Sequence, residues 1–327
     1  MRVVIIGGSG QIGSYLTPRL VEAGHSVVCV SRGLRQPYVA QAAWKGVEPV
    51  VLDRAAEETA GRFGAKIRDL GPDCVIDLTA YTRESTQQLV EALDGCVSHF
   101  LHCGTIWVHG PSVEVPVTED QPRRPISDYG VRKAEIEAYL LDEARRHRFP
   151  ATVLHPGHLV GTGWIPLNPA ANFNPAVFAD LAAGREILLP NLGRETLHHV
   201  HADDVAQAFV QAIAHWSAAV GECFHVVSPA AVSMAGYAEA VAGWFGQQAR
   251  IRFLPWDEWR STVSEKDAKV TWDHIARSPS CSIRKAERLL DYRPRYRSLE
   301  AVRESVAWLA ANRVIETRIP EVVRGME

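Results

Sequence analysis

Two side chains that can exchange protons, Tyr129 and Lys133, stand four residues apart near the middle of the chain. A spacing of i, i+4 places both on one face of a helix. A neighbouring ammonium stabilises a phenolate, so we expect Lys133 to lower the pKa of Tyr129 toward working pH and to make the phenol a usable general acid and base. A plain surface pair is the alternative, because the pattern Tyr-x-x-x-Lys is common by chance.

A glycine-rich segment near the N-terminus predicts a dinucleotide-binding turn. The apolar run Val3–Ile6 leads into glycines at positions 7, 10 and 13, and a helical pattern follows. Such glycines permit a tight turn, close approach of the backbone to a pyrophosphate and close packing of helix on strand, and the helix N-terminus supplies N–H donors. An ordinary tight turn is the alternative. The residues expected to contact the cofactor here are Gly7, Ser9, Gly10, Gln11, Ile12 and Gly13.

The end of the second expected strand distinguishes between NAD and NADP. An acidic side chain at this place binds the ribose 2′-hydroxyl of NAD and repels a 2′-phosphate. The chain carries Ser31 and Arg32 instead, and a guanidinium suits the forked recognition of phosphate oxygens. NADP is therefore favoured over NAD, with a solvated Arg32 that stacks on adenine as the alternative. Asp53, after the third strand, is expected either to accept from the adenine amine or to be a loop carboxylate.

The elements that must position these residues alternate along the first half of the chain. Amphipathic stretches such as Gln11–Ala23 separate short runs of β-branched residues, which is typical of a parallel sheet covered by helices. We therefore predict an α/β fold with a Rossmann-type doubly wound parallel sheet. The expected strands are Arg2–Ile6, Ser26–Val30, Pro49–Leu52, Cys74–Leu78, His99–Cys103 and Ala151–His155.

The pattern changes after Gly163, and we expect a smaller, mostly helical C-terminal substrate domain. One weak helix is expected between Pro166 and Pro190, a strand–helix–strand unit at 198–227 returns to the main sheet, and Arg250–Leu254 forms a further strand. The predicted division is 1–162 with 198–227 for the dinucleotide-binding domain, 163–197 with 228–312 for the substrate domain, and 313–327 for a tail.

The composition is that of an ordinary globular protein, with 46% hydrophobic and 22% charged residues. The 35 Lys and Arg residues against 38 Asp and Glu residues give a net charge of −3, which offers no electrostatic reason to expect nucleic acid or an anionic membrane as a partner. No apolar run approaches the roughly 18 residues of a membrane span. The 6 cysteines form no Cys-x-x-Cys pair, which predicts reduced core thiols in a cytoplasmic protein.

Several segments together resemble the extended short-chain dehydrogenase/reductases, the NAD(P)-dependent epimerase/dehydratase group that includes sugar-nucleotide epimerases. The resemblance runs in order from residue 1 to about residue 312, and it implies a Rossmann domain, a substrate domain and a Ser/Thr–Tyr–Lys active site. The matching segments are the glycines at 7, 10 and 13, Tyr129-Gly-Val-Arg-Lys133, Leu154-His-Pro-Gly-His-Leu-Val-Gly161, His199-Val-His-Ala-Asp-Asp-Val205, and the stretch from Ser282-Ile-Arg-Lys to Leu290-Asp-Tyr-Arg-Pro294.

The resemblance also implies roles for individual residues. Thr105, just after the fifth strand, falls on the Ser/Thr position and would align a substrate hydroxyl or carbonyl with Tyr129, while Lys133 would also bind the nicotinamide ribose. Further cofactor contacts are expected at the carboxyl edge of the sheet, from Leu78, Thr79, Ala80, Pro156 and His158. Further substrate contacts are expected from Trp107, from Asn172 unless it only forms a turn, and from Arg260 and Arg277 unless they are solvated surface groups.

The chain departs from the family pattern at several places near the expected site. Gly104 replaces a small hydroxyl residue, His109 replaces an aromatic residue, and His155 replaces an arginine. Ile106 and Trp107 stand where sugar-nucleotide 4,6-dehydratases carry an acidic pair for the elimination step. Dehydration is therefore disfavoured.

A cluster of possible metal ligands, His198, His199, His201, Asp203 and Asp204, has a simpler interpretation. Alternating residues of a strand point to opposite faces, so the histidines cannot all converge on one ion. We expect a strand followed by a helix, with Asp203 as the helix cap and Asp204 in the first turn, and we predict no metal.

These residues together predict an NAD(P)-dependent oxidoreductase in which Tyr129 exchanges a proton with a secondary alcohol or ketone. The leading expectation is epimerisation of a nucleotide-linked sugar through a keto intermediate, and an NADPH-dependent ketone reductase is the alternative. A non-catalytic nucleotide-sensing or RNA-associated protein is less favoured, because the Thr–Tyr–Lys set is intact and the net charge is negative. The expected partners are a small-molecule substrate and a second copy of the chain, through helices near Glu84–Leu93 and Tyr129–Arg146.

Overall fold

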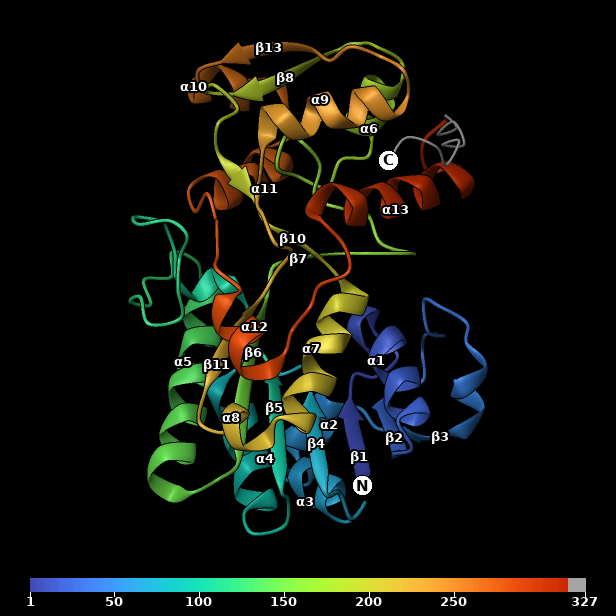
Figure 1. Ribbon diagram of the computed structural model, residues 1–327, viewed down its shortest axis with the longest axis vertical. Coiled ribbons are helices and arrows are strands. Elements are labelled where there is room, and N and C mark those ends of the chain that lie inside the picture. Colours follow the sequence, from blue (N-terminus) through green and yellow to red (C-terminus); the bar gives the residue numbers. More distant parts are fainter. Residues whose placement is uncertain (317–327) are drawn as a thin grey trace.

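A seven-stranded parallel sheet forms the lower part of the molecule in the computed structural model, which describes residues 1–316 (Figure 1). The strand order is β11-β6-β5-β4-β1-β2-β3, the doubly wound arrangement that the alternating pattern predicts. The strands are β1 (Arg2–Ile6), β2 (Ser26–Ser31), β3 (Val47–Val51), β4 (Cys74–Asp77), β5 (His99–Cys103), β6 (Ala151–Pro156) and β11 (Cys223–Val226).

Helices cover both faces of this sheet, and alternate residues of a strand serve opposite faces. Val3 and Ile5 of β1 pack with Leu16 in one core cluster, whereas Val4 and Ile6 belong to the cluster on the other face. The first face carries α1 (Gln11–Glu22), α7 (Ala202–Ala214), α8 (Trp216–Ala219) and α12 (Arg284–Leu290). The second carries α2 (Arg54–Thr59), α3 (Phe63–Arg68), α4 (Arg83–Leu93) and α5 (Asp128–Asp142).

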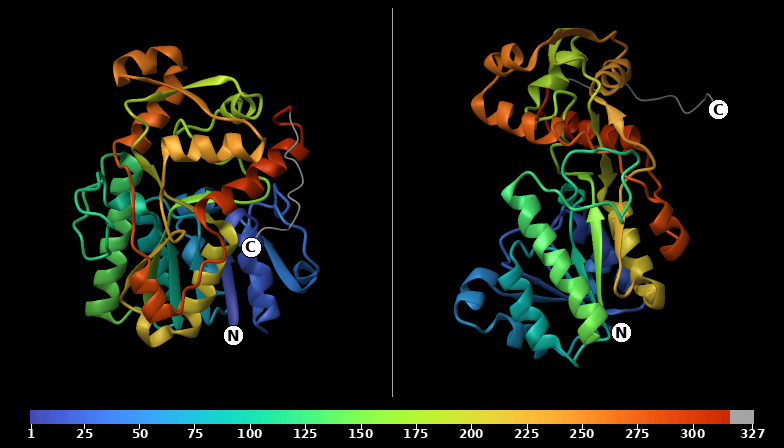
Figure 2. Two further views of the ribbon diagram at one scale, coloured as in Figure 1. Left: turned by 45° about the horizontal axis from the view of Figure 1, so that its top comes forward. Right: turned by 90° about the vertical axis from the view of Figure 1, so that its left-hand side faces the viewer.

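A second group of elements, which we call the upper lobe, sits beyond the carboxyl ends of the strands (Figures 1 and 2). It has its own core cluster, in which Tyr237 and Trp259 are the largest buried side chains. Its helices are α6 (Ala176–Ala182), α9 (Met234–Trp244), α10 (Trp256–Trp259), α11 (Glu265–Ile275) and α13 (Ser298–Ala311). Its strands form three pairs, β7 (His158–Val160) with β10 (His199–His201), β8 (Glu186–Pro190) with β13 (Arg250–Leu254), and β9 (Thr196–Leu197) with β12 (Val232–Ser233).

Short helical turns complete the described chain. They are η1 (Ala42–Gly46), η2 (Ile106–Val108), η3 (Glu143–His147) and η4 (Arg260–Thr262). Within residues 1–316 no helix combines the length and the apolar character needed to cross a membrane. Most of the expected tail, residues 317–327, lies outside the described residues.

The structure corrects three expectations about the elements. The first strand of the unit at 198–227 does not return to the main sheet, because β10 pairs with β7 and only β11 joins β6. The strand β8 was not expected at all, and it exists because it pairs in parallel with β13. Asp203 does not cap α7; His201 is the N-cap and its Nδ1 accepts from the Asp203 N–H at 3.1 Å, while Asp204 lies in the first turn as expected.

Candidate active site

A cleft of about 720 Å³ opens at the carboxyl edge of the sheet, above β1, β2 and β4. Its floor is the turn between β1 and α1, where Gly7 has a φ of +89° that disfavours any side chain. A Cβ at Gly7 would lie 2.4 Å from Thr79 Cγ2, and one at Gly13 would lie 2.1 Å from the Gly8 carbonyl oxygen. The cleft is lined by Gly7, Ser9, Gly10, Ser31, Arg32, Asp53 and Thr79 among others.

This cleft fits a dinucleotide. The α1 N-terminus opens onto it without a side-chain cap, so backbone N–H groups are free to meet a pyrophosphate. The side-chain amide of Gln11 is buried, and neither its nitrogen nor its oxygen has a hydrogen-bond partner in the protein. Buried polar atoms are normally hydrogen-bonded, so a bound ligand would supply the missing partners. The residues that would hold the pyrophosphate of a cofactor here are therefore those of the turn at 7–13, as the sequence predicts.

The cations around the cleft are not equivalent. Arg54 is committed to the protein, with Nη1 2.7 Å from Asp77 Oδ1 and Nε 2.6 Å from Glu58 Oε1. Arg32 is exposed at the end of β2, lines the cleft, and has no ion-pair partner within the described part of the chain. Asp53 also lines the cleft, but its Oδ1 accepts from the Ala56 N–H and caps α2. Arg35 also lines the cleft, but its Nη1 donates to the Tyr38 hydroxyl and its guanidinium lies over the Tyr38 ring. Of the arginines that line the cleft, Arg32 is thus the one with no side-chain partner in the described part of the chain.

The three residues expected to act on a substrate come from two neighbouring elements. Thr105 follows β5 and caps η2, its Oγ1 accepting from the Trp107 N–H at 3.3 Å. Tyr129 and Lys133 lie in α5, which Ser127 caps. Lys133 is 3% exposed, and its Nζ donates to the carbonyl oxygens of Ala80 at 2.7 Å and Cys103 at 2.8 Å. The ammonium therefore joins the ends of β4 and β5 beside the cleft.

The expectation that Lys133 lowers the pKa of Tyr129 is wrong for this arrangement. Burial of the hydroxyl raises the pKa of Tyr129 well above its ordinary value, although the residue as a whole is 39% exposed, and Cys103 and Tyr81 add to the rise. The neighbouring Thr105 side chain works in the opposite direction without reversing the shift. The ammonium of Lys133 faces carbonyl oxygens instead of the phenol. Tyr129 is thus a protonated phenol at neutral pH.

An aromatic wall stands on the side of Tyr129 that faces the upper lobe. The Trp107 ring lies 5.8 Å from the Tyr129 ring, 6.1 Å from His158 and 5.1 Å from His274, measured between centroids. Arg277, which is 1% exposed, stacks on the other face of this wall, 3.9 Å from the Trp107 centroid, and its Nη2 donates to Ser127 Oγ at 2.8 Å. Arg277 therefore braces Trp107 and the cap of α5, a role that its sequence did not reveal.

Two other expected substrate residues are engaged elsewhere. Asn172 is 2% exposed, and its amide bonds with Asn168 at 2.6 Å, Thr271 at 3.2 Å and the Asn174 N–H at 3.0 Å. Arg260 lies in η4, with its side chain 58% exposed and 3.3 Å from Asp257. The structure thus brings Thr105, Trp107, Tyr129, Lys133 and His158 together and leaves Asn172 and Arg260 in the upper lobe with partners of their own.

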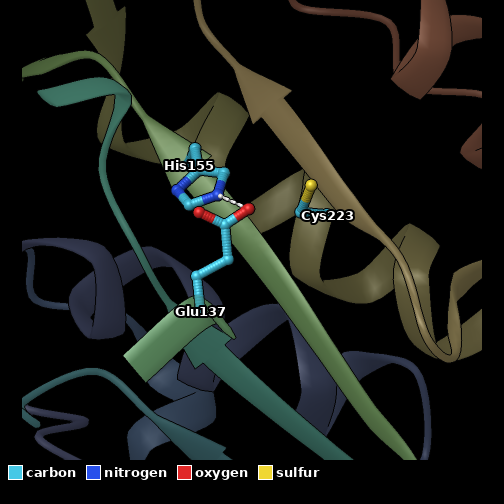
Figure 3. A group of neighbouring side chains, drawn as sticks. All are labelled: Glu137, His155 and Cys223. Atoms are coloured by element: carbon cyan, nitrogen blue, oxygen red, sulfur yellow. Dashed lines mark ion pairs between the residues drawn. The ribbon is translucent and has the colours of Figure 1, made fainter. Parts of the chain in front are cut away.

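Behind Thr105 lies a buried polar group that the sequence analysis did not anticipate. Glu137, His155 and Cys223 converge from α5, β6 and β11 (Figure 3), and their ligand atoms lie within 4.8 Å of one another. Arg123 already supplies the positive charge, because it contacts both Glu137 oxygens, at 3.0 and 3.2 Å by Nε, and Cys223 Sγ at 3.3 Å. Burial raises the pKa of the Cys223 thiol to about 12. A signal was present, since Glu137 follows Tyr129 at i+8 and Lys133 at i+4 on the same helix face.

The histidines at 198–201 each have separate protein partners. His198 Nε2 pairs with the Ser228 carbonyl oxygen at 2.8 Å, and His199 Nε2 pairs with the Leu167 carbonyl oxygen at 3.2 Å. His201 stacks on Tyr296 with centroids 4.1 Å apart, and Asp203 forms an ion pair with Arg19 at 2.7 Å. The Asp203–Arg19 pair joins α7 to α1 on one face of the sheet.

The chain matches the NAD dependent epimerase/dehydratase family over residues 3–226. It is 28% identical over 228 residues to 2′-dehydrokanamycin reductase of Streptomyces kanamyceticus, a match that covers 70% of this chain and 62% of that protein. It is 28% identical over 244 residues to UDP-glucose 4-epimerase of Azospirillum brasilense, covering 65% and 68%.

Two further comparisons extend over nearly the whole chain. The chloroplast stem-loop binding protein of 41 kDa b from Arabidopsis thaliana is 24% identical over 326 residues, which covers 93% of this chain and 78% of that protein. The crystal structure of UDP-glucose 4-epimerase with UDP-glucose from Thermotoga maritima superposes with a TM-score of 0.71 at 20% identity, covering 95% of this chain and 99% of that one. The structural likeness shows that the folds agree.

Proposed function

The chain belongs to the NAD dependent epimerase/dehydratase family, and we propose that within it this protein is a reductase that uses NADPH on a ketone of a sugar-like ring. The observation that carries the proposal is the end of β2, where Ser31 and the unpaired Arg32 line the cofactor cleft in place of an acidic side chain. A guanidinium there attracts a 2′-phosphate, and an acid would repel it. NADPH is the form that a reductive enzyme exchanges in each cycle.

The state of Tyr129 suits the reductive direction. In ketone reduction the carbonyl oxygen gains a proton as the carbon gains a hydride, so the neighbouring acid must begin protonated. The raised pKa of Tyr129 keeps its hydroxyl protonated. Thr105 would hold the same oxygen, and Lys133 would hold the nicotinamide ribose by sharing or exchanging one of its present bonds. A bound NADPH supplies the hydride.

A second candidate, epimerisation of a nucleotide-linked sugar, is supported by the relatives named UDP-glucose 4-epimerase. It uses the same three residues but holds its cofactor through the cycle. Two observations make it the second choice. The acid that would bind the ribose of a retained NAD is absent from the end of β2. Asn172, the residue whose resemblance pointed to a nucleotide-linked substrate, has its amide engaged within the protein.

A single assay distinguishes the two candidate functions. The full chain is mixed with NADPH and a panel of cyclic polyhydroxylated ketones, and separately with UDP-glucose, while the nicotinamide absorbance is followed. We expect one mole of NADPH to be consumed per mole of ketone reduced, and none of this with Tyr129→Phe. Interconversion of UDP-glucose and UDP-galactose without net loss of NADPH would establish the second candidate instead.

Three further properties are part of the proposal. The division into 1–162 with 198–227 and 163–197 with 228–312 is supported by the separate core of the upper lobe, but not at every boundary. The strands β7 and β10 lie in that lobe, and α12 packs on the sheet. A homodimer would use α4 and α5, which lie side by side on one face of the sheet, and sedimentation velocity tests it.

A cytoplasmic location suits the free, mostly buried cysteines. A stem-loop is a second-rank candidate ligand, because one relative is named a chloroplast stem-loop binding protein. Filter binding of an RNA stem-loop at two salt concentrations tests it.

A further inference from the structure

The segment that carries Thr105 is held from behind by a side chain of the neighbouring strand. The backbone ladder between β5 and β6 extends to a bond from the Gly104 N–H to the Leu154 carbonyl oxygen, 2.7 Å long. The next donor, the Thr105 N–H, bonds to the imidazole Nδ1 of His155 at 2.9 Å. The imidazole thus takes the place of a backbone carbonyl where the chain leaves the sheet and turns to present the Thr105 hydroxyl.

The other edge of the imidazole faces a carboxylate. Because Nδ1 accepts a hydrogen bond, the ring proton belongs on Nε2, and Nε2 lies 3.4 Å from Oε1 of Glu137 (Figure 3). Both side chains are buried, at 0% and 4% exposure. Burial raises the pKa of Glu137, but the Arg123 guanidinium beside it outweighs this and holds the pKa well below its usual range. A charged, buried carboxylate therefore faces the imidazole and opposes its rotation.

Arg123 anchors this carboxylate to the protein. Besides its two bonds from Nε to Glu137, its Nη1 donates to the carbonyl oxygens of Glu119 at 2.8 Å and Gln121 at 2.6 Å. The series Arg123, Glu137, His155 and the Thr105 backbone is therefore a continuous set of contacts. It ends at one of the three residues assigned to the substrate.

Gly104 makes room for the imidazole. A Cβ at this position would lie 2.4 Å from His155 Nδ1 and 2.7 Å from its Cε1. The requirement is one of space, since the φ of Gly104 is not in the left-handed region. Gly104 and His155 thus share one volume, in which the imidazole occupies the space that a side chain at 104 would need.

We infer that His155, oriented by Glu137 and Arg123, is a positioning residue for Thr105. It fixes the backbone of Thr105 and with it the direction of the hydroxyl that would meet the substrate oxygen. The consequence for turnover rests on the proposed function, whereas the contact itself does not. One well-placed hydrogen bond of this kind corresponds to a change of about tenfold in rate.

The first test reads the contact without any reaction. In nitrogen-15 NMR spectra of the full chain, we expect His155 to carry its proton on Nε2 and the Thr105 amide to be protected from hydrogen exchange. The protection should be lost in His155→Leu and kept in His155→Asn, because an asparagine Oδ1 stands close to the place of the imidazole Nδ1. A proton on Nδ1, or unchanged protection in His155→Leu, overturns the inference whatever the protein's activity is.

The second test measures turnover with a matched control. His155→Leu should lower kcat about tenfold with little change in the KM for NADPH, and His155→Asn should restore most of kcat. The control is His99→Leu, which removes another buried imidazole of the sheet, bonded through Nε2 to Thr152 Oγ1 at 2.9 Å and remote in the ladder from Thr105. Equal loss of kcat in His155→Leu and His99→Leu, or no recovery of kcat in His155→Asn, would contradict the inference that His155 positions Thr105.

A double substitution tests whether a side chain at position 104 and the His155 imidazole compete for the same space. Gly104→Ala alone should lower kcat, because its Cβ displaces the imidazole. The same change should cost little kcat in the His155→Ala background, where the space is free. Additive losses would contradict the shared volume.

Discussion

Lys133 serves the protein and the proposed reaction with the same ammonium. Two of its three donors bond to the carbonyl oxygens of Ala80 and Cys103, and His102 Nε2 lies 3.4 Å away as a third acceptor. Any contact with a ribose must therefore replace or share one of these bonds. Substitution of Lys133 consequently leaves buried carbonyl oxygens without a donor, which costs stability as well as cofactor binding.

Tyr129→Phe and Lys133→Met should separate these roles. The phenylalanine variant should lose turnover by orders of magnitude while its affinity for NADPH and its unfolding free energy stay nearly unchanged, because only the transition state uses that proton. The methionine variant should lose turnover, NADPH affinity and about 1–3 kcal/mol of stability. Steady-state kinetics, fluorescence titration and denaturation check the three quantities. Substantial activity in Tyr129→Phe would refute the assignment of the acid.

Arg32→Asp should reverse the cofactor preference. The native guanidinium lies free at the cleft, so NADPH should bind more tightly than NADH, by about tenfold or more for a charge-assisted contact. An aspartate would repel the 2′-phosphate and accept from the ribose of NAD. Fluorescence titration of both cofactors gives the ratio. Arg185→Asp makes the same charge change in the upper lobe and should leave the ratio unaltered; equal affinities in the native protein would sink the assignment.

Single residues divide sharply in how far the sequence reveals them. The glycines of the first turn and the Tyr129–Lys133 pair are local patterns, so their spacing alone is enough to single them out. Gly7 and Gly10 line the cleft, and Tyr129 and Lys133 share α5. Arg277 and Asn172 could not be assigned in this way, because their partners Trp107, Ser127 and Thr271 come from distant parts of the chain. The prediction that Lys133 lowers the pKa of Tyr129 failed for the same reason, because this pKa depends on the groups that surround the hydroxyl in the folded protein.

At the scale of elements, the packing of α1 on β1 determines whether the cofactor turn exists. Gly13→Ala should abolish measurable NADPH binding and destabilise the protein by several kcal/mol, because its Cβ would lie 2.1 Å from the Gly8 carbonyl oxygen. Gly243→Ala in α9 is the matched control, since no atom lies within 4 Å of its Cβ. That variant should be neutral or more stable by about 0.5–1 kcal/mol. Thermal denaturation measures the stability of both variants, and titration measures their affinity for NADPH. Equal effects of Gly13→Ala and Gly243→Ala would contradict the role of Gly13 in packing α1 on β1.

The main sheet was predictable and the upper lobe was less so. The strands β1, β2, β4, β5 and β6 are short, mostly apolar runs near their expected places, because burial on both faces leaves a strong local signal. The edge strand β3 is partly exposed, and its observed range Val47–Val51 is shifted from the expected Pro49–Leu52. The strand β13 lies at its expected place, Arg250–Leu254, but its partner β8 was missed. The segment of β8 is partly exposed and pairs with a strand more than fifty residues further along the chain. A pattern confined to one segment cannot report such a pairing.

Stability of the whole molecule should depend on the buried ion pair beneath the cleft. Burial raises the pKa of Asp77, but Arg54 outweighs it and lowers this pKa to about 2. A depressed carboxyl pKa contributes stability above the unfolded value, near 4, that is lost as the pH falls through the folded value. The gap in unfolding free energy between the native protein and Asp77→Asn should therefore narrow between about pH 4 and pH 2.

Denaturation at several pH values measures this gap. Asp69→Asn is the control, because the Arg68–Asp69 pair is exposed, at 47% and 65%, and such pairs contribute little. A gap for Asp77→Asn that stays constant down to pH 2 would mean that the carboxylate is not held by Arg54.

The whole account requires one arrangement, in which a cofactor bound in the cleft meets Thr105, Tyr129 and Lys133 at its reacting end. A crystal structure of the full chain with NADP+ tests this most directly. We predict the 2′-phosphate at Arg32, the pyrophosphate at the N-terminus of α1, Lys133 on the nicotinamide ribose, and the nicotinamide ring facing the Tyr129 hydroxyl. A nicotinamide ring outside the cleft, or a 2′-phosphate away from Arg32 with Lys133 still bonded only to Ala80 and Cys103, would contradict it.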